Sequence, residues 1–441
     1  MTSNRQEITL GDICDIKHGY AFQGVFFSDT PTNDILLTPG NFKVGGGFKG
    51  DNYHYYIGEV PEDYILDVGD LILTMTDLSK NSDTLGFPAL VPKVEGLRFL
   101  HNQRLGKVIL INDKVDKYYL YYAFCTDKYR NEVLASATGT TVKHTSPKRI
   151  LSYRFSIPQI DEQKSIAHIL GTLDEKIELN RRMNETLEGI ARALFKSWFI
   201  DFDPVRAKAE GHQPFGMDQE TAALFPDQFE DSELGEIPKG WKVKSLDEIA
   251  KFLNGLALQK YPPRGIETLP VIKIAELNRG INKGTSRASN VPDDYIVNDG
   301  DVLFSWSGSL ELKIWCEGKG ALNQHLFKVT SDDFPSWFYY QWVAHHLDSF
   351  RKIAAGKATT MGHIQRHHLT EALTVVPTVK ILDISNNIFM PLFELYINNS
   401  LNNRYLSRVR DCLLPKLISG DLRVDPARFS LGPEGEKVGE V

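Results

Sequence analysis

The chain has few cysteines and no long apolar run. Its 441 residues include only four cysteines, Cys14, Cys125, Cys316 and Cys412, none close to another. Scattered cysteines fit reduced thiols better than a disulfide framework or a zinc site. No apolar run approaches the roughly 20 residues needed to span a bilayer, and the first residues lack the pattern of a signal peptide. We therefore expect a cytoplasmic protein that does not bind membranes.

The sequence also lacks an overall positive charge. Its formal net charge is −7, but this charge is unevenly distributed, because residues 218–236 contain seven acidic side chains and no basic one. Residues 138–154 and 351–370 are the opposite, with basic side chains and no carboxylate. A locally basic surface is the usual requirement for binding phosphates, so the net charge does not exclude a nucleic-acid partner.

The chain contains one pattern twice. Residues 60–74 read VPEDYILDVGDLILT and residues 291–305 read VPDDYIVNDGDVLFS, identical at seven of fifteen positions. Further along, HNQRLGKVI (101–109) matches LNQHLFKVT (322–330), and ATGTTVKH (137–144) matches GKATTMGH (356–363). This order indicates duplication of a whole module, with the two basic segments at equivalent places. A single basic segment is typically a solvated loop, but its recurrence favours phosphate binding. Two similar modules suit a target with two similar halves.

Each module combines strands and helices. Alternating apolar residues bounded by turn residues predict strands at 53–57, 70–74, 105–111 and 301–306. Aromatic segments at 118–134 and 337–354 predict helices. The fold class is therefore α+β, with two similar mixed α/β domains, and the chain is long enough for each to bury a core.

Two long helices follow the modules. Apolar residues spaced by three and four form a first seam at Ile166, Leu170, Leu173, Ile177, Asn180, Asn184, Leu187, Ala191, Leu194 and Trp198. A second seam comprises Ile388, Leu392, Leu395, Asn399, Asn402, Leu406, Val409, Leu413 and Leu417. We predict that the helices pair as an antiparallel coiled coil, although each could instead pack on its own domain. The central asparagines Asn180, Asn184, Asn399 and Asn402 would set the register.

The ends of the second helix and the effect of its asparagines follow from the same pattern. Pro391 is expected near its start or at a kink, and Pro415 and Gly420 are expected to end it. Buried asparagine lowers stability while fixing register, so replacing Asn180 and Asn399 with leucine is expected to raise the melting temperature.

Four segments resemble one known family. They are FSIPQIDEQKSIAHILGTLDEKI (155–177), ALFKSWFIDFDPVRAK (193–208), LGEIPKGWK (234–242) and LLPKLISGDLRV (413–424). Together they are similar to the specificity (S) subunits of type I restriction–modification systems, and the resemblance spans nearly the whole chain. The chain departs from that pattern at PTVKILDISNNIF (377–389), which lacks the EQ pair present at 162–163.

The resemblance implies a domain order with an internal pseudo-twofold repeat. It comprises a first DNA target-recognition domain at 1–158, a long spacer helix at 159–200, an acidic linker at 201–239, a second target-recognition domain at 240–378, a second spacer helix at 379–421 and a tail at 422–441. We expect the linker to be a plain solvated tether.

The resemblance also implies a function. Each recognition domain would read one half of a bipartite double-stranded DNA target, while the helices set the spacer and dock two modification subunits. Those subunits would bind S-adenosylmethionine and methylate adenine, and two restriction subunits using ATP and Mg²⁺ could join them. The chain itself would carry no cofactor and no catalytic residue.

The residues agree with a non-catalytic role. The chain has no NPPY-type tetrapeptide, and Gly318-Lys319 and Gly356-Lys357 lack the rest of a phosphate-binding loop. The sequence HIQRH from His363 to His367 lacks the glutamate of a zinc protease, so no metal site is expected.

Base edges and phosphates are contacted by Arg, Lys, Asn, Gln, His and hydroxyl side chains. For Gln103 and for the threonines among the main candidates given below, the alternative to DNA contact is a hydrogen bond that stabilises a turn. Ser79, Lys80, Ser305, Ser307 and Lys313 are weaker candidates. The main candidates are Gln103, Arg104, Thr140, Thr141, Lys143, His144, Lys148, Arg149, Gln324, His325, Lys357, Thr359, Thr360, His363, Gln365 and Arg366.

Two other functions are compatible with parts of the sequence. A self-contained DNA methyltransferase would need the missing tetrapeptide. A coiled-coil scaffold without direct DNA readout would explain the helices but not the paired basic segments.

Overall fold

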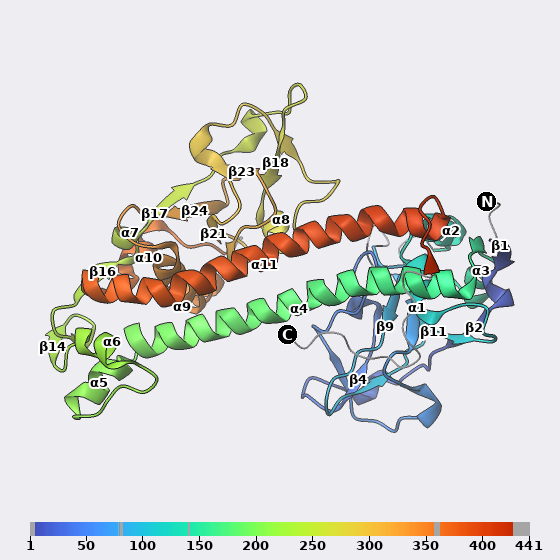
Figure 1. Cartoon of the computed structure of the whole chain (residues 1–441), viewed down its shortest axis with the longest axis horizontal. Helices are drawn as coiled ribbons and strands as arrows, with labels where there is room; N and C mark the ends of the chain where they lie inside the picture. Colours follow the sequence, from blue (N-terminus) through green and yellow to red (C-terminus); the bar gives the residue numbers. More distant parts are fainter. Residues whose placement is uncertain (1–4, 78, 80–82, 140–141, 357–361, 427–441) are drawn as a thin grey trace. The chain divides into compact units, whose positions relative to one another are not determined.

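The computed structural model of the chain describes residues 5–77, 79, 83–139, 142–356 and 362–426. The chain divides into two compact units, Met1–Glu175 with Ser407–Val441, and Lys176–Leu406. The division passes through both long helices, α4 (Ile160–Phe199) and α11 (Val379–Ser419). Each unit therefore contains one globular module and part of each long helix (Figure 1). No helix in the described ranges is long and apolar enough to cross a membrane.

The first unit holds a four-stranded sheet, β2-β11-β7-β9, and a five-stranded sheet, β3-β5-β4-β10-β6. Strand β1 pairs with β13, and β8 pairs with β12. The strands are β1 Gln6–Thr9, β2 Cys14–His18, β3 Phe27–Ser28, β4 Asp34–Leu36, β5 His54–Tyr56, β6 Ile65–Leu66, β7 Leu71–Thr74, β8 Thr76–Asp77, β9 Pro88–Leu90, β10 Arg98–Leu100, β11 Leu105–Leu110, β12 Lys143–His144 and β13 Arg154–Ile157. The helices are α1 Lys117–Phe124, α2 Asp127–Ser136 and α3 Pro147–Leu151.

The second unit has matching sheets, β17-β24-β21-β22 and β19-β18-β23-β20, and a pair β16–β25. Its strands are β14 Phe229–Ser232, β15 Gly235–Pro238, β16 Lys242–Ser245, β17 Lys251–Asn254, β18 Leu269–Ile272, β19 Arg287–Ala288, β20 Ile296–Val297, β21 Val302–Ser305, β22 Leu312–Ile314, β23 Gly320–Leu322, β24 Leu326–Thr330 and β25 Leu373–Val376. The helices are α5 Asp203–Ala209, α6 Gln219–Leu224, α7 Leu246–Ile249, α8 Ile274–Arg279, α9 Ser336–Gly356 and α10 Arg366–Glu371.

The strand orders confirm the duplication. In each unit the second sheet contains one parallel pair, β4 with β10 and β18 with β23, at the same place in the order. The repeated sequence motif forms the central strand of the first sheet, β7 or β21. That strand is buried on both faces. Its alternate residues contribute to different cores, as Leu71 and Leu73 belong to one and Ile72 to another. This double burial explains the unbroken apolar run at the end of the motif.

The predicted helices differ between the modules. The segment 337–354 is part of one helix, α9, as expected. The segment 118–134 is instead broken into α1 and α2, because Thr126 caps the second helix and its hydroxyl accepts the backbone N–H of Tyr129 at 3.4 Å. A threonine at this position competes with continuation of the preceding helix.

Helices α4 and α11 pair antiparallel, as predicted. In the second unit, Asn180 Nδ2 donates to Asn403 Oδ1 at 2.9 Å. In the first unit, Asp174 lies six residues earlier in α4, and its carboxylate accepts from Arg410 Nη1, further along α11, at 2.7 Å. Residue numbers rise in one helix as they fall in the other, which defines the antiparallel direction. The helices also begin at equivalent positions, with Ile160 and Val379 separated by the same 219 residues as Asn180 and Asn399.

The predicted seam of α11 is partly wrong. Ile388 and Leu395 are 36% and 42% exposed and Asn402 is exposed, while Phe389 and Phe393 are buried. Asn403, and not Asn402, faces α4. A helix has 3.6 residues per turn and a heptad assumes 3.5, so a strict heptad drifts by about 20° per repeat. Positions 388, 395 and 402 therefore lie off the buried face, while Asn399 and Leu417 are buried as predicted.

One proline of α11 is placed differently from the prediction, because Pro415 lies inside the helix and does not end it. Pro391 also lies inside the helix and does not start it, and a kink at this residue stays a prediction. Gly420, whose φ is +87°, follows the last helical residue. A positive φ suits glycine, and this residue ends the helix as expected.

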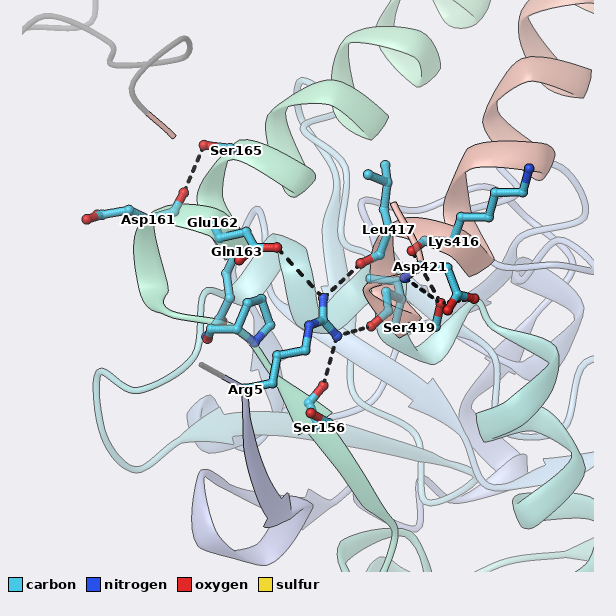
Figure 2. A network of polar contacts seen from close by, with 12 residues as sticks. Arg5, Ser156, Asp161, Glu162, Gln163, Ser165, Lys416, Leu417, Ser419 and Asp421 are labelled. Carbon is cyan, nitrogen blue, oxygen red and sulfur yellow. Dashed lines mark hydrogen bonds and ion pairs between the residues drawn. The ribbon is translucent and has the colours of Figure 1, made fainter. Parts of the chain in front are cut away.

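In the first unit the start of the chain contacts the end of α11. The guanidinium of Arg5 donates to the carbonyl of Ile418 at 2.5 Å and to that of Leu417 at 3.0 Å (Figure 2). It lies 4.0 Å from the Glu162 carboxylate at the start of α4. The last carbonyls of a helix have no N–H partner within the helix, so Arg5 satisfies two of them. The amino-terminal strand is thereby joined to both long helices within one unit.

Residues 201–239 are not the solvated tether expected from the sequence. They form α5, α6 and the β14–β15 hairpin. Val205, Phe225 and Ile237 are 0%, 1% and 4% exposed and belong to the core of the second unit. The apolar residues between the acidic ones supply the packing that holds this segment in place.

Candidate nucleic-acid interface

A tight turn follows β10 in the first module and β23 in the second. Each turn passes close to a glycine, because a Cβ on Gly19 would lie 2.0 Å from the carbonyl oxygen of Asn102, and one on Gly255 would lie 2.2 Å from that of Asn323. Any side chain there would displace the turn. The turns carry Gln103 and Arg104 in one module and Gln324 and His325 in the other.

The same backbone hydrogen bonds hold both turns. The N–H of Gln103 donates to the carbonyl of Tyr20, and that of Gln324 to the carbonyl of Leu256, both at 2.9 Å. On the other side, the N–H of Met75 donates to the carbonyl of Arg104 at 2.9 Å. Its equivalent in the second module runs from Trp306 to His325 at 3.3 Å.

The basic segment joins each turn through the residue that follows β7 or β21. Thr145 donates its N–H to the carbonyl of Met75 at 2.9 Å. Ile364 donates to the carbonyl of Trp306 at 3.0 Å. In each module, three segments far apart in sequence are therefore held together by equivalent hydrogen bonds: 18–20, 101–105 and 143–149 in one, and 254–256, 322–326 and 362–366 in the other. We call each set of three segments a recognition ladder.

The ladder of the first module places several candidate residues at the surface. Gln103, Arg104, His144, Lys148 and Arg149 are exposed, and Lys143 is half-buried. The Arg149 guanidinium donates to the hydroxyl of Thr138 at 3.2 Å, which orders one end of the basic segment. Exposed cations and amides on a fixed backbone are suited to phosphate and base-edge contacts.

The ladder of the second module is more polar and less basic. Gln324, His325 and His363 are half-buried, while Gln365 and Arg366 are exposed. The Arg366 guanidinium contacts the carbonyl of Phe252 at 3.4 Å and lies 5.9 Å from the ring of Phe327, so part of its donor capacity is used within the protein.

Trp306 organises this second ladder. Its indole N–H lies 2.9 Å from Asn254 Oδ1 and 3.1 Å from the carbonyl oxygen of Gln324. Its ring centroid lies 5.8 Å from that of His325 and 6.3 Å from that of His363. The tryptophan thus contacts all three segments.

Some candidates are placed elsewhere or not described. Ser305 is fully buried and donates to the carbonyl of Ser309 at 2.6 Å, so it cannot reach DNA. Lys313 donates to the carbonyl of Leu277 at 2.8 Å and lies outside the ladder. Six further candidates lie outside the described residues: Lys80, Thr140, Thr141, Lys357, Thr359 and Thr360.

A buried carboxylate orders the strand beside the first ladder. Asp77 in β8 is 3% exposed, and its side chain accepts the backbone N–H groups of Ser79 at 2.6 Å, Thr84 at 2.5 Å and Leu85 at 3.0 Å. Burial raises the pKa of this carboxyl group, but the hydrogen bonds from Ser79 and Thr84 outweigh burial and leave the pKa lowered. Asp77 is therefore ionised, and its strand pairs with Lys143 of the ladder.

One group of side chains near the second ladder has spacing suitable for a metal ion. Possible ligand atoms of His367, His368 and Glu371 lie within 4.8 Å of one another. His363 is not part of this group, so the sequence HIQRH does not act as a unit. His368 Nδ1 accepts the backbone N–H of Gln365 at 2.8 Å, so this nitrogen is used within the protein.

Sequence reasoning missed the glycine segment of each ladder, although a signal was present. Residues 18–23 read HGYAFQ and residues 254–259 read NGLALQ, sharing Gly, Ala and Gln at equal spacing. Glycine at the first shared position is required by the close approach of the turn. Trp306 was missed because the equivalent residue in the first module is Met75, so no repeat marks it.

The fold and these ladders define a duplicated recognition protein: two similar α+β modules, each presenting a polar loop set, and two paired long helices. Comparison with known proteins identifies the class. Residues 2–189 and 238–378 match the family described as the type I restriction modification DNA specificity domain. The chain belongs to this family.

The relatives include whole specificity subunits. The chain is 29% identical over 333 residues to the type I restriction enzyme MjaIX specificity subunit of Methanocaldococcus jannaschii, a match that covers 72% of each chain. It is 27% identical to the HindI specificity subunit of Haemophilus influenzae, covering 67% of this chain and 75% of that one. In fold, it is similar to the S subunit of a type I restriction-modification system from M. genitalium, with a TM-score of 0.56, 14% identity and coverage of 95% and 96%.

These findings place the chain among the specificity subunits, which recognise DNA targets within a larger complex and are themselves non-catalytic. The alternative of a coiled-coil scaffold without DNA readout is not favoured.

Proposed function

We propose that this chain reads a bipartite DNA target, with one half-site contacted by each recognition ladder. The observation that supports this is the repetition of the ladder with different side chains. The hydrogen bonds that hold Gln103 and Gln324 have the same length and connect equivalent segments. The next residue is Arg104 in one ladder and His325 in the other. One backbone frame therefore presents two different sets of side chains, and the two half-sites differ in sequence.

The side chains determine the kind of contact. Arg104 is exposed, and no hydrogen bond or ion pair involves its guanidinium among the residues that the structure describes. A free guanidinium can donate two hydrogen bonds to guanine in the major groove, and a glutamine amide can pair with adenine. Lys148 and Arg149 beside it would contact phosphates and set the position of the module on the duplex.

The paired helices would set the distance between the half-sites and dock the partner subunits. Two modification subunits would bind S-adenosylmethionine and methylate adenine, and two restriction subunits using ATP and Mg²⁺ can complete the assembly. The internal repeat supports a two-to-one arrangement, because α4 and α11 begin at equivalent positions and offer two similar surfaces. The present chain contributes DNA recognition only.

Arginine substitutions test the assignment of half-sites. In the complex assembled with modification subunits, Arg366→Ala is expected to weaken binding to DNA carrying the correct second half-site. Arg104→Ala is expected to do the same for the first. Loss of a base contact costs about 1–3 kcal/mol, or roughly 5-fold to 150-fold in affinity. Fluorescence anisotropy with duplexes altered in one half-site at a time measures both effects.

Lys49→Ala is a suitable control, because Lys49 is exposed, pairs with Asp51 at 3.0 Å and lies outside the ladders. An Arg366 variant with unchanged affinity and unchanged half-site preference removes that residue from the interface. A wild-type complex that binds all duplexes equally contradicts the proposed function itself.

A further inference from the structure

In each module, a hydroxyl group beside the recognition ladder contacts a histidine ring of the ladder. In the first module the hydroxyl of Thr76 lies 3.1 Å from His144 Nδ1. In the second, the hydroxyl of Ser307 lies 2.9 Å from His325 Nδ1. Thr76 and Ser307 are equivalent, since each is the second residue after the central strand β7 or β21.

The histidines are not equivalent. His144 belongs to the basic segment, whereas His325 belongs to the turn after β23. The counterpart of His144 in the repeat is His363, which forms a backbone bridge with the same Ser307. The two modules thus have a hydroxyl group at the same position. Its imidazole partner comes from the basic segment in the first module and from the turn after β23 in the second.

The hydroxyl-bearing residues and the histidines differ in burial. Thr76 and Ser307 are 8% and 4% exposed, so little of either residue is open to a ligand. His144 is exposed and His325 is half-buried. A buried hydroxyl needs a hydrogen-bond partner, and here the histidine provides it from the surface side.

The contact constrains the imidazole ring. With Nδ1 held by the hydroxyl, the ring can turn little, and Nε2 is the second ring nitrogen. For His144, no hydrogen bond to Nε2 occurs within the described ranges of the chain. For His325, Nε2 accepts from the amide Nε2 of Gln324 at 3.3 Å, so this nitrogen already has a partner and the imidazole and the amide form one polar surface.

We propose that Thr76 and Ser307 are positioning residues for DNA recognition, holding His144 and His325 in the orientation in which each imidazole meets its half-site. This inference rests on the proposed function. The ligand group is a base edge or a backbone phosphate oxygen of double-stranded DNA. Because the positioned histidine comes from the basic segment in one module and from the turn in the other, the two modules present an imidazole at different places relative to their glutamines.

Four variants test the proposal in the complex assembled with modification subunits. Thr76→Val keeps the shape of the side chain and removes the hydroxyl, and Thr76→Ser keeps the hydroxyl. Ser307→Ala and Ser307→Thr are the matching pair in the second module. Binding is measured with duplexes in which one half-site is changed one base pair at a time.

We expect Thr76→Val to reduce discrimination at the first half-site by about tenfold, in line with the loss of one hydrogen bond. Discrimination at the second half-site stays unchanged, and Thr76→Ser retains wild-type behaviour. Ser307→Ala gives the reverse pattern, and Ser307→Thr retains wild-type discrimination. Equal loss at both half-sites, or loss that the hydroxyl-retaining variants do not restore, overturns the inference.

A double variant separates positioning from a purely structural role. His144→Ala, with Thr76 intact, should lose discrimination at the first half-site to the same extent as Thr76→Val. If Thr76→Val does not fold, the loss caused by His144→Ala still tests whether the imidazole contributes to recognition. Adding Thr76→Val to His144→Ala should cause no further loss. A further loss overturns the inference, because the hydroxyl then acts independently of the imidazole. Failure of the wild-type complex to discriminate would instead contradict the proposed function.

Discussion

At the scale of single residues, the recognition ladders depend on two glycines and two buried asparagines. Gly19 and Gly255 allow the turns to approach within 2.0 and 2.2 Å of the position of a missing Cβ. The side chains of Asn102 and Asn323 then accept the N–H of Arg104 at 3.0 Å and of His325 at 3.4 Å. These residues explain how two modules with different surface residues keep one backbone frame.

Asp77 gives a prediction at this scale. Its carboxylate accepts four hydrogen bonds from Ser79, Thr84 and Leu85, and an asparagine would turn an N–H₂ group toward some of those donors. Asp77→Asn is therefore expected to lower the stability of the first unit by about 2 kcal/mol. Thermal unfolding followed by circular dichroism measures the change.

The pH dependence follows from the lowered pKa of Asp77. A carboxylate with a folded pKa below its unfolded value of 3.8 stabilises the fold above that pH, and this contribution is lost as the pH falls through the folded pKa. The difference in the free energy of unfolding between wild type and Asp77→Asn should therefore be constant from about pH 5 to pH 7 and shrink below about pH 4. Asp83→Asn, at an exposed neighbour, is the matched control. A stability difference between wild type and Asp77→Asn that stays the same at low pH would contradict this account.

Part of the candidate site could be predicted from the sequence. Gln103 and Gln324 were found because the repeat marks both, and the structure holds them at equivalent turns. Thr76 was not found, because a threonine two residues after a strand has no distinctive pattern. Its importance arises only when residues 143–144 pair with β8, and no local sequence signal encodes that contact.

At the scale of elements, the asparagines between α4 and α11 form two specific pairs. Asn180 donates to Asn403, and Asn399 donates to Asn184 at 3.0 Å. Asn184 in turn donates to the hydroxyl of Ser400 at 2.9 Å. Asn180 and Asn399 are therefore not partners. Replacing these two with leucine would leave Asn403 and Asn184 without their amide partners, so the increase in melting temperature expected from the sequence does not follow from this geometry.

Replacing both members of one asparagine pair tests the role of the hydrogen bond between them. Asn180→Leu with Asn403→Leu removes both members of one pair and is expected to raise the melting temperature by a few degrees, since apolar contacts replace a polar one. Asn180→Leu alone should lower it, because Asn403 loses its partner. Differential scanning calorimetry of the two single variants and the double variant measures this. Single variants as stable as the double would show that the hydrogen bond has no role.

The elements show what sequence pattern predicts well and where it fails. The central strands β7 and β21 were predicted because unbroken apolar residues follow a turn signal in both copies. The seam of α11 was misplaced at 388, 395 and 402 because a strict heptad drifts from the helical period. At 402 and 403 the side chains are identical, so only contact with α4 distinguishes them. Residues 201–239 were misread because acidic composition masks Val205 and Phe225, whose burial depends on the core of the second unit.

At the scale of the whole molecule, the duplication itself is the basis of function. Two copies of one strand order, with parallel pairs at the same place, provide two equivalent frames. The side chains on those frames have diverged, most clearly at Arg104 and His325. The long helices have kept their starting positions and their central asparagines Asn180 and Asn399. Divergence in the loops together with retention in the helices is the pattern required of a protein that reads two unlike half-sites at a fixed separation.

The central claim is that each module reads its own half of one bipartite target. Methylation-sensitive sequencing of a host that expresses this chain with its modification subunits tests the claim most directly. We predict a single methylated motif with two unlike halves separated by an unspecified gap of constant length, and a methylated adenine in each half. A continuous motif, a gap of variable length or methylation that is independent of this chain would contradict the account.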